Sequence, residues 1–92
     1  MRIDGDWKVV RVGGLLPPLV GVSKRISGGR GETRIGRLPG VPFDVDDLRL
    51  QYRPPFAVFV DVLEPDGQGF AGRATFHGWT FGRFRMLPIG PR

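Results

Sequence analysis

Hydrophobic and polar residues alternate in short runs along this chain, and glycines and prolines separate the runs. Alternation with a period of two is typical of strands that bury one face, and no stretch keeps the 3.6-residue period of a helix over several turns. The runs rich in Val, Ile, Phe, Trp and Thr predict seven strands, at Trp7–Val12, Val20–Ile26, Thr33–Leu38, Asp47–Tyr52, Ala57–Glu64, Phe70–Phe76 and Trp79–Leu87. The segment PFDVDDLR (42–49) is expected to hold at most one helical turn.

Two turn signals join the last three strands. In Pro65-Asp66-Gly67, the proline presets φ for a turn and the glycine tolerates a positive φ. His77-Gly78 is a two-residue connection between Phe76 and Trp79, as in hairpins with primed turns. The three strands therefore form an antiparallel meander. Many short strands at regular spacing predict an all-β fold, a small antiparallel up-and-down β-barrel of about seven strands, with residues 1–92 as a single domain.

The faces of these strands mix small, aromatic and charged side chains. On strand 70–76 the face that carries Phe70 and Phe76 is otherwise Gly72 and Ala74, which suits a tightly curved barrel. On strand 79–87 one face holds Trp79, Phe81, Arg83 and Arg85. Asp61 shares a face with Ala57, Phe59 and Leu63. Because an unpaired buried carboxylate is costly, the sequence predicts a partner for Asp61 among Arg73, Arg83 and Arg85.

The composition of the chain excludes several classes of function. The chain has 92 residues, a net charge of +5 and no cysteine, which leaves no thiolate metal site, disulfide or thiol catalysis. The positive charge is dispersed rather than gathered in a tail. No run approaches the ~18 apolar residues of a membrane-spanning helix, and acids occupy the place of a signal-peptide core, so a cytoplasmic protein is expected.

Few residues in the sequence are candidates for catalysis, phosphate binding or metal binding. The only histidine, His77, lies in a predicted turn, and the glycine-rich SGGRGETR (27–34) lacks the Gly-Lys-Ser/Thr ending of a phosphate-binding loop. The acidic DVDD (44–47) lacks the glycine and distal glutamate of a calcium loop. We therefore predict no catalytic residue, no metal and no cofactor.

The opening of the first strand resembles the signature of lipocalins and related calycins. Gly5-x-Trp7 stands where that family has a Gly-x-Trp, and Arg83 or Arg85 falls where it has an arginine over the tryptophan ring. The chain is much shorter than lipocalins and shows no second or third family motif. The resemblance implies a barrel that binds a small, largely apolar molecule, with Trp7 packed across the closed end.

Three functions remain open. The first is a lipocalin-like barrel that binds a small apolar or lipid-like molecule or pairs with itself to complete its core, in which case a homodimer would cover Leu15, Leu16 and Leu19. The second is a single-stranded nucleic-acid-binding barrel that uses the Trp79, Phe81, Arg83 and Arg85 face. The third is a cyclase or isomerase that acts by pocket shape, with Asp61 and Tyr52 as candidates for acid–base catalysis. The predicted ligand-binding residues are Tyr52, Phe59, Asp61, Arg73, Trp79, Phe81, Arg83 and Arg85.

Overall fold

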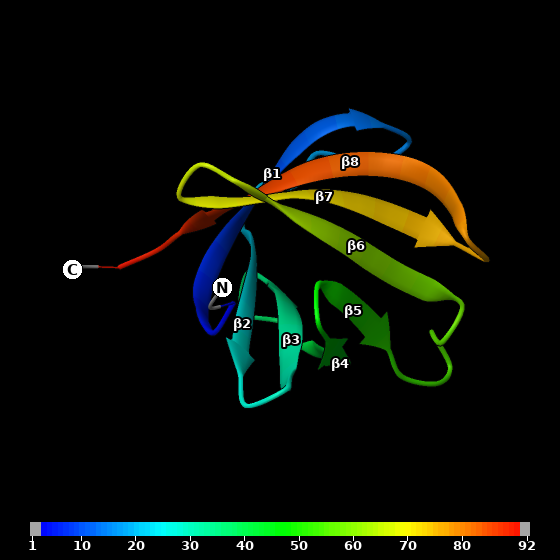
Figure 1. Ribbon diagram of the computed structural model, residues 1–92, viewed down its shortest axis with the longest axis horizontal. Helices are drawn as coiled ribbons and strands as arrows, with labels where there is room; N and C mark the ends of the chain where they lie inside the picture. The colour runs from blue at the N-terminus through cyan, green and yellow to red at the C-terminus, as the bar shows by residue number, and fades with distance from the viewer. Residues whose placement is uncertain (1–2, 91–92) are drawn as a thin grey trace.

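The computed structural model describes residues 3–90, which form eight strands and no helix (Figure 1). The strands are β1 (Gly5–Gly14), β2 (Val22–Ser27), β3 (Arg30–Ile35), β4 (Val41–Asp46), β5 (Arg49–Tyr52), β6 (Phe59–Asp66), β7 (Gly69–Phe76) and β8 (Trp79–Pro88). Within this part of the chain there is accordingly no helix long and apolar enough to cross a membrane.

The strands close into an antiparallel up-and-down barrel. Each strand pairs with the next one in sequence, and β8 pairs with β1. The predicted fold class is therefore confirmed, with eight strands in place of about seven. Closure matters because it leaves no sheet edge without a partner.

The strand that the pattern misses is β4. The prolines and glycine of LPGVPF (38–43) indicate a break between strands, and PFDVDDLR (42–49) was expected to hold at most one helical turn. Pro42 is instead the second residue of β4, opposite Glu32 of β3, a place near a strand start where a missing N–H is tolerated. The turn to β5 is Asp47-Leu48, and Asp47 has a φ of 56°.

The predicted hairpins are present, one of them with a shifted turn. His77 and Gly78 have φ values of 51° and 83°, as a type I′ turn requires. Between β6 and β7 the two turn residues are Gly67 and Gln68, so β6 continues through Pro65 and Asp66. The glycine-rich segment after β2 supplies the turn to β3, as expected.

The up-and-down order assigns every connection to one of two ends. The connections at 15–21, 36–40, 53–58 and 77–78 lie at one end, here called the open end. The two-residue turns at 28–29, 47–48 and 67–68 lie at the other, the closed end, where β1 begins and β8 finishes (Figure 1).

Inward-facing side chains fill the closed end. The buried residues there are Trp7, Ile26, Phe43, Leu50, Leu63, Phe70 and Met86. Trp7 is only 6% exposed, its ring meets that of Phe70 edge-on at 5.3 Å, and its Nε1 donates to the Ile3 carbonyl at 2.8 Å. The burial predicted for Trp7 is confirmed. Gly72 also faces inward, and a Cβ there would collide with the ring of Phe84, so glycine is needed for this packing.

Candidate functional site

A cavity of about 380 Å³ lies between this core and the open end. Its wall is mostly apolar and comes from inward strand positions and from the open-end connections. The apolar residues around it include Val9, Leu16, Leu19, Val22, Phe56 and Phe59. Because Leu16, Leu19 and Phe56 belong to open-end connections, the cavity opens to solvent there.

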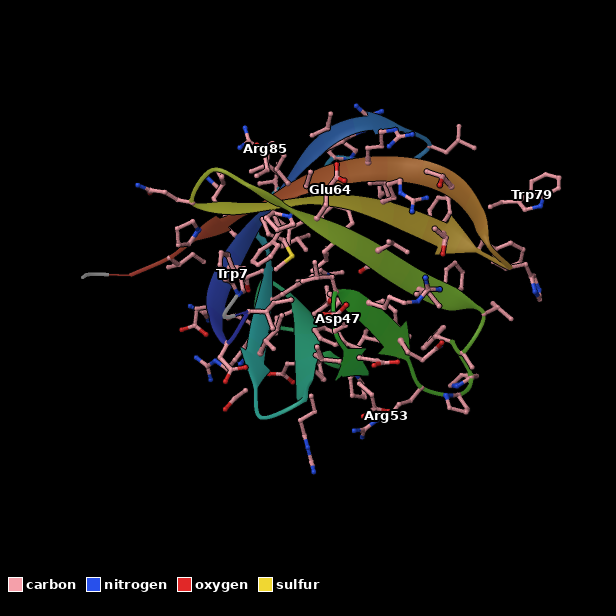
Figure 2. All side chains as sticks on the ribbon, in the orientation of Figure 1. Trp7, Asp47, Arg53, Glu64, Trp79 and Arg85 are labelled. Atoms are coloured by element: carbon pink, nitrogen blue, oxygen red, sulfur yellow. The ribbon has the colours of Figure 1, made fainter. Side chains whose placement is uncertain are left out.

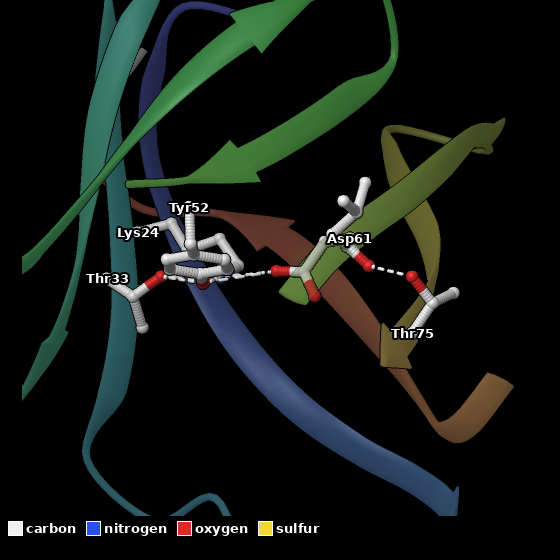
Figure 3. A network of polar contacts seen from close by, with 6 residues as sticks. Lys24, Thr33, Tyr52, Asp61 and Thr75 are labelled. Atoms are coloured by element: carbon white, nitrogen blue, oxygen red, sulfur yellow. Dashed lines mark hydrogen bonds and ion pairs between the residues drawn. The ribbon is translucent and has the colours of Figure 1, made fainter. Parts of the chain in front are cut away.

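Four polar side chains of the cavity lining contact one another, as Figure 3 shows. Lys24 of β2 lies at the centre, with Nζ 3.0 Å from Asp61 Oδ2, and donates to Thr33 Oγ1 at 2.6 Å and to Tyr52 Oη at 2.8 Å. Tyr52 Oη donates to Asp61 Oδ2 at 3.2 Å and lies 2.6 Å from Thr33 Oγ1. We call Lys24, Thr33, Tyr52 and Asp61 the polar cluster.

The charges in the cluster stabilise one another. Burial disfavours the ammonium form of Lys24, but Asp61 and Tyr52 outweigh this and raise the pKa of Lys24 above its ordinary value. Burial also raises the pKa of Tyr52, and the negative charge of Asp61 adds to this against the opposing charge of Lys24. At neutral pH Lys24 is therefore charged and Tyr52 is a neutral hydrogen-bond donor. The rings of Phe43, Tyr52 and Phe84 lie 5.4–5.5 Å from Lys24 Nζ and add cation–π attraction.

Half of the predicted ligand-binding residues line the cavity. They are Tyr52, Phe59, Asp61 and Phe81. The predicted partner of Asp61, however, is wrong. Asp61 pairs with Lys24 and not with Arg73, Arg83 or Arg85, because strand alternation turns these three arginines to the outside of β7 and β8.

A β-bulge divides the face that was expected to carry Trp79, Phe81, Arg83 and Arg85. Ala74 pairs with Gly82 and Thr75 with Thr80, so Phe81 has no opposite residue. Phe81 turns into the cavity, where its ring lies 6.1 Å from that of Phe59. Trp79 is 81% exposed and projects from the β7–β8 hairpin (Figure 2). The predicted single aromatic and basic platform is therefore wrong.

The arginine expected over the tryptophan is also absent from that position. Trp7 points into the barrel, whereas Arg85 is on its outer surface (Figure 2). Arg83 is also exposed. Arg85 forms an exposed ion pair with Asp66 at 3.2 Å, and Arg73 donates to Thr80 Oγ1 at 3.0 Å. Of the features that suggested lipocalins, the buried tryptophan is present in this structure and the arginine contact is not.

Asp61 and Tyr52 are adjacent, as an acid–base pair would be, but the cluster does not suit proton transfer. A general acid works best when its pKa lies near the operating pH. The pKa of Tyr52 is raised, away from neutrality, and Asp61 is held in an ion pair with Lys24. The arrangement supports binding better than catalysis.

Sequence reasoning missed Lys24 and Thr33. A signal for Lys24 was present in VSKRIS (22–27), because alternation puts Lys24 on the same face as Val22 and Ile26. A charged residue among apolar ones on one strand face is the same signal that singled out Asp61. No comparable signal identifies Thr33, which lies opposite Lys24 in the β2–β3 ladder.

No protein-family model matches this sequence, and no curated protein or solved structure matches it either. The geometry of the barrel itself is therefore the basis for its function.

Proposed function

We propose that this protein binds a small, largely apolar molecule in the cavity at the open end of its barrel. The observation that carries the proposal is the cavity itself, about 380 Å³ in volume, with an apolar wall and one polar cluster. Binding sites for small molecules commonly have volumes of roughly 300–1,000 Å³ and a few polar groups in an apolar lining.

The architecture supports the same function. One end of the barrel is filled around Trp7, and the other is open, which is similar to the arrangement expected from the lipocalin resemblance. The interior of an eight-stranded barrel is just wide enough to be filled by side chains or to hold one small ligand. Here the two share the interior, with the core at one end and the cavity at the other.

The nucleic-acid alternative receives less support. Stacking needs exposed aromatic rings beside basic groups, but Phe81 faces the cavity and Arg85 is paired with Asp66. Glu64 and Asp66 line the same outer groove as Arg73, Arg83 and Arg85, and their charges weaken its positive field.

A fluorescence titration with N-phenyl-1-naphthylamine, a neutral apolar dye, tests the proposal. We expect saturable binding at one site that persists at about 150 mM salt, because burial of apolar surface is not screened by ions. Absence of saturable binding to the folded protein would overturn the proposed function.

Two alanines of β7 provide a matched pair of variants for locating the site. Ala74 faces the cavity, whereas Ala71 lies on the outer face of the same strand. Ala74→Leu should fill part of the cavity and weaken dye binding at least tenfold, a free-energy change of about 1.4 kcal/mol. Ala71→Leu should leave dye binding unchanged. Equal effects of the two substitutions would place the dye elsewhere.

The homodimer stays a prediction. Large apolar side chains are exposed around the open end, among them Leu15 at 84%, Val20 at 88% and Leu38 at 61%. Contact between two open ends would cover them. Sedimentation equilibrium over a range of concentrations is the measurement, and a constant monomer mass would contradict the prediction.

A further inference from the structure

The donor groups of the polar cluster are directed at oxygen atoms of the cluster itself. The Lys24 ammonium has three N–H groups. It donates to Thr33 Oγ1 at 2.6 Å and to Tyr52 Oη at 2.8 Å, and it forms an ion pair with Asp61 Oδ2 at 3.0 Å. A ligand that approaches Lys24 therefore meets an ammonium group that three oxygen atoms of the cluster already surround.

The hydroxyl hydrogens of Tyr52 and Thr33 are also donated within the cluster. Tyr52 donates to Asp61 Oδ2, so in the short contact between Tyr52 and Thr33 the donor is Thr33. Tyr52 Oη then accepts from both Lys24 and Thr33, which occupies its two lone pairs. What remains in the cluster is acceptor capacity.

Asp61 holds most of that capacity. Its Oδ2 accepts from Tyr52 and forms the ion pair with Lys24, whereas Oδ1 forms no hydrogen bond with any residue in 3–90. Within the same residues, no buried side-chain nitrogen or oxygen lacks a partner. Oδ1 is therefore not fully buried, and since Asp61 lines the cavity, Oδ1 is accessible from it.

We propose that the cavity selects an apolar molecule that carries a neutral hydrogen-bond donor, a hydroxyl or an amide N–H, which donates to Asp61 Oδ1. This inference rests on the proposed function and specifies the class of ligand. A carboxylate fits poorly for two reasons. It has no hydrogen to donate, and the charge of Lys24 that would attract it is already neutralised by Asp61 at 3.0 Å.

Three competitors of N-phenyl-1-naphthylamine test the inference, because each has an unbranched ten-carbon chain and they differ in the head group. They are 1-decanol, which has a donor, methyl decyl ether, which has only an acceptor, and decanoate, which is an anion. We expect 1-decanol to displace the dye roughly tenfold more tightly than the ether, since a hydrogen bond to a charged group contributes about that much. Decanoate should be the weakest of the three at neutral pH.

A double variant shows whether the cluster sets the preference. Lys24→Met with Asp61→Leu replaces both charges by apolar side chains of similar size, which leaves no buried charge without a partner. In this variant the affinity ratio between 1-decanol and the ether should fall to about one. A purely structural role of the ion pair would leave that ratio at its wild-type value, and such a result would overturn the inference.

The outcomes separate this inference from the proposed function. If the dye and all three competitors fail to bind, the proposed function fails and the inference with it. If the dye binds and decanoate competes as well as 1-decanol or better, the cavity is a binding site but its selectivity is not the one inferred. The same holds if the alcohol and the ether compete equally with the wild-type protein.

Discussion

Lys24 of β2 and Asp61 of β6 meet at 3.0 Å inside the barrel, although their strands stand on opposite sides of it. Three strands separate them in either direction around the closed sheet, so no backbone ladder brings them together. Both side chains are less than a tenth exposed. Their contact therefore joins opposite walls of the barrel, and both residues line the cavity.

The first prediction concerns this ion pair. Lys24→Met or Asp61→Leu alone leaves one buried charge without its partner and should lower the free energy of unfolding by about 3–5 kcal/mol. The double variant should be more stable than either single variant, because neither charge remains. Urea denaturation of the three variants measures this. Additive losses in the double variant would show that the two charges are not coupled.

The second prediction compares the two tryptophans. Trp7 is 6% exposed and Trp79 is 81% exposed. Trp7→Ala removes a large core side chain and should lower the free energy of unfolding by about 3–5 kcal/mol. Trp79→Ala should change it by no more than about 0.5 kcal/mol, as at other exposed positions. A loss below about 1 kcal/mol for Trp7→Ala in urea titration would contradict the described core.

The third prediction is a loss of stability at alkaline pH. The pKa of Tyr52 is raised above 10.0 and that of Lys24 above 10.5 in the folded protein. Above about pH 10 the unfolded chain therefore loses protons that the folded chain still holds, and stability falls as the pH rises. Below these values both groups are protonated in both states, and their contribution to stability is fully present.

Tyr52 is the only tyrosine, so tyrosinate absorbance follows this group directly. Its midpoint should lie above the ordinary value of 10.0, and Tyr52→Phe should weaken the dependence of the urea midpoint on pH. Lys8→Met is the control, because Lys8 is the other lysine and is exposed. A tyrosinate midpoint at or below 10.0 would contradict the described burial.

The fourth prediction concerns the outer arginines. Arg83→Gln with Arg85→Gln should change the free energy of unfolding by less than about 1 kcal/mol, because both side chains are exposed and the one ion pair between Arg85 and Asp66 lies at the surface. Binding of oligo-dT should be weak at about 150 mM salt in the wild-type protein. Tight, salt-sensitive oligo-dT binding that the stable double variant loses would favour the nucleic-acid function instead.

Local sequence patterns determined much of the barrel. Alternation predicted the strands, and His77-Gly78 predicted its hairpin, because these signals act between residues close in the chain. The apolar neighbours of Asp61 predicted a carboxylate on a partly buried face. Gly72 and Ala74 on one face of β7 predicted close packing there. In the structure Gly72 packs closely against the ring of Phe84. β4 was missed because proline and glycine at its start suggest a break, although the strand pairs on both sides.

Only the tertiary structure decided what meets inside the barrel. Strict alternation put Phe81 on the outside with Arg83, but a bulge opposite Ala74 and Thr75 turned it into the cavity. The partner of Asp61 came from 37 positions earlier in the chain, on a strand four places away in the barrel. Alternation specifies the face of a strand but not which strands stand opposite, because that depends on the number of strands at which the sheet closes.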